Sequence, residues 1–123
     1  MKEERASEEM LLRLLGPAGF IRLVEAYGGV RLYVPETASR TDLVREIGDR
    51  AALKLADRWG GFYIRVPLAK EFRARHYRAA GASNAQIARK LGMTEPGVNQ
   101  LFGRMDNVPV KGSGDPRQLK LFG

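Results

Sequence analysis

The sequence NAQIARKLGMTEPGVNQLFG, at Asn84–Gly103, decides the fold expected for the C-terminal half of this 123-residue chain. It predicts two short helices around a tight turn. Ser83 or Asn84 can begin the first helix, because a short side-chain oxygen accepts a hydrogen bond from a free helix amide. Gly92 can end it, since the turn requires a positive φ. Thr94 can begin the second helix, and Pro96 fits its first turn, where no amide hydrogen is needed.

The apolar residues of this stretch recur at helical spacing and are expected to pack the two helices together. A small residue stands where the helices cross closely, and an apolar pair fixes the second helix on the first. We assign this core to Ile87, Ala88, Leu91, Gly92, Val98 and Leu101. These features together are typical of a helix-turn-helix, whose second helix reads DNA. The alternative is an ordinary helical hairpin with a solvated polar face.

Two amide side chains, Asn99 and Gln100, are expected on the outer face of the second helix. An amide can donate and accept together, as the edge of adenine requires. A basic helix, from about Leu68 to Ala80, precedes them and completes a three-helix unit. The candidates for contacts with the DNA backbone are Arg73, Arg75, Arg78, Asn84, Arg89, Lys90 and Arg104. The alternative for each cation is a solvated surface charge.

The charge of the chain, +7 in total, is distributed unevenly. Residues 1–64 hold ten Lys/Arg and ten Asp/Glu, whereas residues 65–123 hold eleven and four. A neutral half joined to a basic half suggests one part for assembly and one for a polyanion. The basic excess coincides with the expected helix-turn-helix, which favours nucleic acid over a generally basic soluble protein.

Two helices are expected before residue 28, one from Ser7 to Gly16-Pro17 and one from about Ala18 to Tyr27. Neither is long enough to be stable alone, so their apolar faces must be buried, against a second copy of the chain if necessary.

A near-repeat follows, in which GGVRLYVP at residues 28–35 recurs as GGFYIRVP at residues 60–67. Alternation of period two predicts two short, half-buried strands, which are expected to pair within the chain or across a dimer. A long helix, from Thr41 or Asp42 to about Trp59, lies between them.

The GGVRLYVP strand, the helix after it, the second strand and the segment RAAGASNAQIARKLGMTEPGVNQLF resemble the Mor transcription activators of Mu-like phages and prophages, over roughly Gly28–Phe102. The resemblance implies a homodimer that binds a dyad DNA site in the bacterial nucleoid and recruits RNA polymerase. It also implies base readout by Thr94, Glu95, Asn99 and Gln100. Pro96-Gly97 departs from the usual start of such a recognition helix, because glycine weakens it.

The last five residues before Gly123, QLKLF, resemble the peptide with which bacterial replication and repair proteins dock on the polymerase sliding clamp. In such a peptide Leu121 and Phe122 would enter an apolar pocket while Gln118 binds at the rim. We therefore assign clamp binding to Gln118, Leu119, Leu121 and Phe122. The alternative is that these apolar side chains fold back onto the chain itself.

No enzymatic site, cofactor or metal site is expected. The single histidine, His76, lies on a basic helix, the glycine pairs lack the Lys-Ser/Thr of a phosphate-binding loop, and the chain has no cysteine. No apolar run has the length of a membrane span and no signal peptide is recognised, so a cytoplasmic protein with no membrane partner is expected.

The expected fold is α+β, mainly α with two short strands. Its parts are a dimerisation domain at residues 1–66, a helix-turn-helix domain at residues 67–104 and a flexible tail at residues 105–123. The expected function is a homodimeric transcription activator. The alternatives are a DNA-binding adaptor that docks on the sliding clamp, or a repressor of the same fold.

Overall fold

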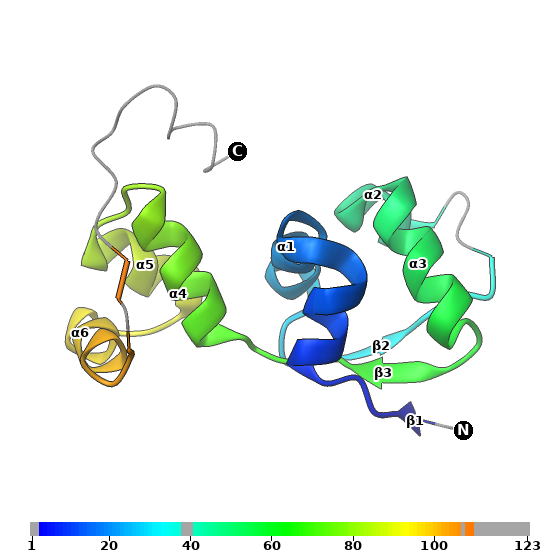
Figure 1. Ribbon diagram of the computed structural model, residues 1–123, viewed down its shortest axis with the longest axis horizontal. Helices are drawn as coiled ribbons and strands as arrows, with labels where there is room; N and C mark the ends of the chain where they lie inside the picture. The colour runs from blue at the N-terminus through cyan, green and yellow to red at the C-terminus, as the bar shows by residue number, and fades with distance from the viewer. Residues whose placement is uncertain (1–2, 38–40, 107, 110–123) are drawn as a thin grey trace. The chain divides into compact units, whose positions relative to one another are not determined.

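The computed structural model describes residues 3–37, 41–106 and 108–109 (Figure 1). The chain divides into two compact units, residues 1–69 and residues 70–123, which we call the first and second units. The described residues form six helices and one small sheet, so the expected α+β class, mainly α, is confirmed. None of the described helices is both long enough and apolar enough to cross a bilayer.

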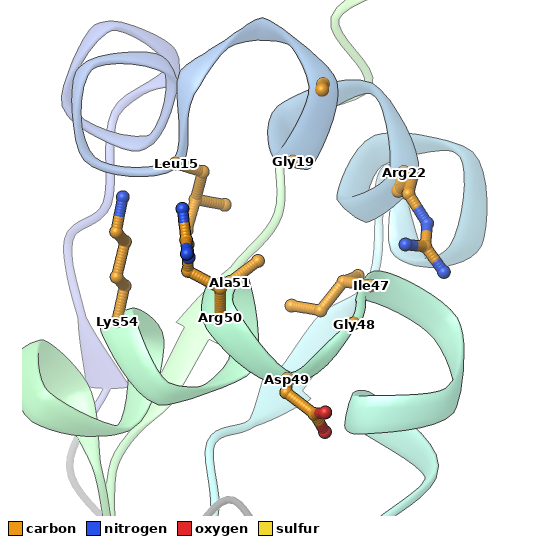
Figure 2. A pocket seen from close by; sticks show the side chains of 10 residues that line it. Leu15, Gly19, Arg22, Ile47, Gly48, Asp49, Arg50, Ala51 and Lys54 are labelled. Atoms are coloured by element: carbon orange, nitrogen blue, oxygen red, sulfur yellow. The ribbon is translucent and has the colours of Figure 1, made fainter.

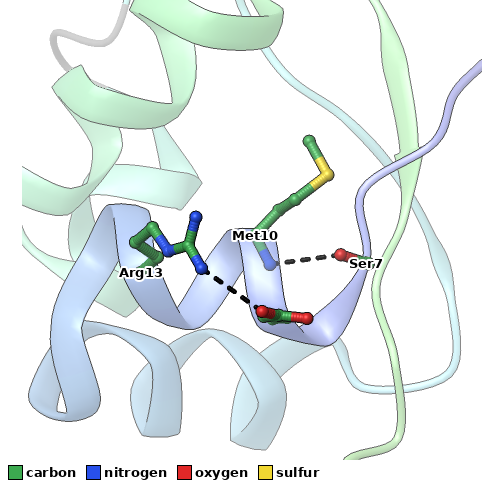
Figure 3. Close-up of polar contacts among 4 residues, drawn as sticks. Ser7, Met10 and Arg13 are labelled. Atoms are coloured by element: carbon green, nitrogen blue, oxygen red, sulfur yellow. Dashed lines mark hydrogen bonds and ion pairs between the residues drawn. The ribbon is translucent and has the colours of Figure 1, made fainter.

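Helix α1 (Glu8–Tyr27) contains both of the helices expected before residue 28, joined across a kink at Gly16. It begins where the sequence predicted, because Ser7 Oγ accepts a hydrogen bond of 3.1 Å from the amide of Met10 (Figure 3). Arg13 pairs with Glu9 at 3.2 Å on its exposed side. Beyond the kink, the helix buries its apolar residues Phe20, Ile21, Leu23 and Val24.

The prediction of one long helix between the strands is wrong in one respect, because the segment forms two helices, α2 (Asp42–Ile47) and α3 (Asp49–Trp59). Gly48 separates them with φ 90° and ψ 162°, far outside the helical region. Thr41 Oγ1 accepts a hydrogen bond of 3.3 Å from the amide of Val44, which fixes the start of α2. An apolar ridge of residues four positions apart is nevertheless buried on both sides of the break, at Leu43, Ile47, Ala51 and Leu55.

The sheet has the order β1-β3-β2 (Glu3–Glu4, Tyr63–Arg65 and Arg31–Tyr33). Strands β2 and β3 pair antiparallel within the chain, with Leu32 opposite Ile64, so no second copy is needed to complete this ladder. Strand β1, which the sequence did not predict, runs parallel to β3. Figure 1 shows α1, α2 and α3 on one side of these strands.

The repeat detected in the strands extends over most of the first unit. Equivalent residues 32 positions apart make equivalent hydrogen bonds: the amide of Gly29 donates to the carbonyl of Val66 at 2.8 Å, and the amide of Gly61 donates to that of Val34 at 2.8 Å. Equivalent side chains are also buried, as in the pairs Leu11/Leu43, Leu23/Leu55 and Val34/Val66. The first unit therefore consists of two copies of one helix–helix–strand motif, related by an approximate two-fold axis.

The second unit contains α4 (Lys70–Ala79), α5 (Asn84–Leu91) and α6 (Glu95–Gly103). Helix α5 packs against both neighbours. The buried residues of the three helices and the connection between α4 and α5 are Ala74, Tyr77, Ala80, Ala82, Ile87, Ala88, Leu91 and Val98.

Candidate nucleic-acid interface

The turn between α5 and α6 has the conformation that the sequence predicted. Gly92 ends α5 with φ 65° and ψ 38°, in the left-handed region, and the amide of Met93 donates to the carbonyl of Ala88 at 2.9 Å. A Cβ atom at Gly92 would meet no atom within 4 Å, so the backbone conformation, and not space, favours glycine here.

Helix α5 begins with a complete capping box. Ser83 Oγ accepts a hydrogen bond of 3.2 Å from the amide of Gln86, and Gln86 Oε1 accepts one of 2.8 Å from the amide of Ser83. Of the two cap candidates, Ser83 and Asn84, the structure uses Ser83, and the Ser-x-x-Gln spacing is the sequence signal that distinguishes it.

Helix α6 begins at Thr94, whose Oγ1 accepts a hydrogen bond of 3.1 Å from the amide of Gly97. The glycine in the first turn of α6, Gly97, has a local reason. A Cβ atom at Gly97 would lie 3.1 Å from Thr94 Oγ1 and 3.3 Å from the Met93 side chain, so a larger residue would crowd the cap.

Four of the six residues assigned to the core between α5 and α6 are buried, namely Ile87, Ala88, Leu91 and Val98. Leu101 is half-buried, and Gly92 is exposed at the turn. Because Ile87 and Val98 are completely buried, they fix the position of α6 against α5.

All four residues assigned to base readout, Thr94, Glu95, Asn99 and Gln100, are exposed. Glu95 and Asn99 are four residues apart and share one face of α6, and Gln100 follows one position along. The side-chain oxygen of Thr94 already serves as the helix cap. The polar groups of Glu95, Asn99 and Gln100 do not take part in this cap.

The sequence analysis assigned Arg73 and Arg75 to phosphate contacts. In the structure both are half-buried and donate hydrogen bonds to backbone carbonyls of the second unit. Arg73 Nη2 donates to the carbonyl of Lys90 at 3.0 Å, at the C-terminal end of α5, where a cation is favourable. Arg75 Nη2 donates to the carbonyl of Asp106 and lies 3.4 Å from a carboxylate oxygen of Glu71. Both side chains therefore contribute to the stability of the three-helix unit.

Arg78 connects all three helices of the second unit. Its Nη2 donates to Oδ1 of Asn84, the first residue of α5, and its guanidinium carbon lies 4.8 Å from the centroid of the Phe102 ring on α6. This brings together Arg78 and Asn84, two residues that the sequence assigned independently to the DNA backbone.

The other three cations assigned to the DNA backbone, Arg89, Lys90 and Arg104, are exposed. The ammonium group of Lys90 lies 5.1 Å from the centroid of the Tyr77 ring, which restrains it near α4. The second unit thus presents exposed cations on α5 and after α6, and exposed polar side chains on α6 itself.

Comparison with known proteins returned no similar family model, no similar curated protein and no similar solved structure. The four residues assigned to clamp binding, Gln118, Leu119, Leu121 and Phe122, lie outside the described residues. Among the described residues, no group of three or more acidic or histidine side chains could hold a metal ion.

Proposed function

We propose that this chain is a sequence-specific DNA-binding transcription regulator and that its second unit is a helix-turn-helix domain. The observation that carries this proposal is the exposed surface of α6, where Glu95 and Asn99 share one face and Gln100 is exposed next to Asn99 in sequence, on a helix fixed by a buried core. A helix placed in the major groove reads bases with such side chains.

Phosphate contacts would come from the exposed cations Arg89, Lys90 and Arg104. They flank the readout face in sequence, and contacts of this kind set the register of a domain on DNA without reading its sequence. Arg73, Arg75 and Arg78, in contrast, would act mainly by holding the helices together.

The resemblance to Mor activators supports a homodimer that binds a dyad site and recruits RNA polymerase. The β2–β3 ladder is already complete within one chain, so a dimer would need to use another surface of the first unit. Whether the regulator activates or represses depends on where its operator lies relative to a promoter.

Selection of bound duplexes from a random pool tests the proposal. A dyad consensus would support a dimer on DNA, and a single short consensus would support a monomer. Gln100→Ala and Asn99→Ala should each relax the preference at one position, losing about 1–3 kcal/mol of discrimination. Arg45→Gln, which removes an exposed charge from α2 in the first unit, is the control. Equal binding to all duplexes by the wild type would rule out specific readout.

The QLKLF sequence favours a second candidate function, an adaptor that links a DNA site to the sliding clamp. Purified clamp should then be retained by the intact chain, and Leu121→Ala/Phe122→Ala should abolish retention. A clamp that is not retained by the wild type would eliminate this candidate and leave DNA binding unaffected.

A further inference from the structure

A cavity of about 330 Å³ lies in the first unit, between the kink in α1 and the start of α3 (Figure 2). Its lining residues reflect the internal repeat, because they include the pairs Leu15/Ile47, Gly19/Ala51 and Arg22/Lys54, whose members are 32 positions apart. The cavity therefore lies on the approximate two-fold axis that relates the two copies of the motif.

The repeat also explains why space remains there. Gly16 and Gly48 each interrupt the helical backbone next to the cavity, so the helical turn after Gly16 faces the helical turn after Gly48. These turns approach closely at small residues, since a Cβ atom at Gly19 would lie 3.5 Å from that of Ala51.

The lining carries three cations and one carboxylate. Arg50 and Lys54 run side by side from α3 toward α1, whereas the side chain of Asp49 points the other way (Figure 2). Arg22 lies apart from them, beside Gly48, since a Cβ atom at Gly48 would be 3.1 Å from its Nη1 (Figure 2). Among the described residues, neither these two cations nor Arg22 forms an ion pair with a carboxylate. The two adjacent cations, Arg50 and Lys54, produce a positive potential at their end of the cavity, although residues 1–64 as a whole are neutral.

The floor of the cavity is apolar, since Leu15 and Ile47 contribute to it and both are buried. A volume of this size, with an apolar floor and a few polar groups at the rim, is typical of sites for small molecules. A site built only to hold an inorganic ion would not need the apolar floor.

We propose that this cavity binds a small organic anion. A phosphate or carboxylate head would contact Arg50 and Lys54, and an apolar portion would rest on Leu15 and Ile47. The ligand would join the two copies of the motif, and its binding would stabilise the first unit by mass action. This inference concerns the first unit alone and does not depend on DNA binding by the second.

Titration of the full chain, followed by NMR of the backbone amides, tests the proposal. Phenyl phosphate or benzoate should cause saturable shifts at Gly19, Gly48 and Asp49, and the tighter of the two identifies the preferred head group. Benzyl alcohol, which has the ring but no charge, should bind at least about tenfold more weakly, because it forms no charge-assisted hydrogen bonds.

Two variants and one control decide the outcome. Arg50→Gln/Lys54→Gln should weaken binding at least about tenfold. Ala18→Phe should fill the cavity and abolish binding while it keeps every charge, whereas Arg45→Gln, an exposed charge outside the cavity, should bind as the wild type does. The proposal would be overturned if benzyl alcohol bound as tightly as the anions, or if both cavity variants bound the anions as tightly as the wild type does. It would also be overturned if neither anion caused any shift.

Discussion

Gly16 and Gly48, which are 32 residues apart, have almost the same backbone conformation, φ 76° and ψ 167° at one and φ 90° and ψ 162° at the other. Each interrupts a helical segment at the same place in its copy of the repeated motif. This region of backbone space is essentially restricted to glycine. The two breaks therefore determine the shape of the first unit and create the cavity between its copies.

Gly16→Ala should consequently destabilise the first unit by about 1–3 kcal/mol. A Cβ atom at Gly16 would meet no atom within 4 Å, so the cost would come from the backbone alone. Urea denaturation followed by the fluorescence of Trp59, the single tryptophan, measures it. Ala26→Ser, at an exposed position of α1, should change stability by less than about 0.5 kcal/mol. An unchanged midpoint for Gly16→Ala would show that the kink is absent in solution.

Arg78→Gln should lower the stability of the second unit by about 1–2 kcal/mol, because it removes the stacking on Phe102 and the charged hydrogen bond to Asn84. Hydrogen exchange of the amides of α4, α5 and α6 measures this loss. Arg89→Gln, which removes an exposed charge from α5, should leave exchange unchanged. If Arg78→Gln weakened DNA binding without any change in exchange, Arg78 would be a phosphate contact and not a structural link.

The salt dependence of DNA binding should identify the phosphate contacts. Arg89→Gln and Arg104→Gln should each reduce the slope of log K against log salt by about one, since each removes one counterion-releasing contact. Their effect should be the same on specific and on random duplexes. Binding measured by fluorescence anisotropy at several salt concentrations gives the slope. If neither variant changed the slope, DNA would bind to another face of the second unit.

The stability of the first unit should decline at alkaline pH through Tyr27. Partial burial raises the pKa of this phenol, the charge of Glu46 raises it further, and Arg45 opposes the shift. Above about pH 10 the unfolded chain loses the phenol proton before the folded chain does, so the free energy of unfolding falls as pH rises until the raised pKa is passed.

Tyr27→Phe should remove this part of the decline, and Glu46→Gln should reduce it. Urea denaturation of the wild type and both variants across the alkaline range measures the differences. A wild type and a Tyr27→Phe variant whose stabilities run parallel over that range would contradict the assignment.

The sequence predicted the helix starts well, because capping depends on residues three or four positions apart. Ser7, Thr41, Ser83 and Thr94 each accept the amide hydrogen bond expected of a helix cap. It failed at Gly48, since the apolar ridge continues across the break and periodicity alone does not reveal a single residue outside the helical region. It also missed β1, whose two residues carry no strand pattern and pair only because the edge of β3 accepts them.

For the candidate interface, the residues of α6 that the sequence assigned to base readout are exposed, but the sequence did not predict the hydrogen bonds of Arg73, Arg75 and Arg78 within the protein. A charged helix looks the same in sequence whether its arginines meet solvent, phosphate or a carbonyl. Only the packing of α4 against α5 and α6 distinguishes these cases.

The sequence by itself determined the ends of the helices, the turn at Gly92 and the concentration of positive charge in the second half. These features depend on local dihedral preferences and on composition. The tertiary structure alone decided that β2 pairs with β3 in the same chain and that a cationic cavity lies on the axis between two copies of one motif. Such features join residues about thirty positions apart, and they form only when the chain closes and buries both copies against each other.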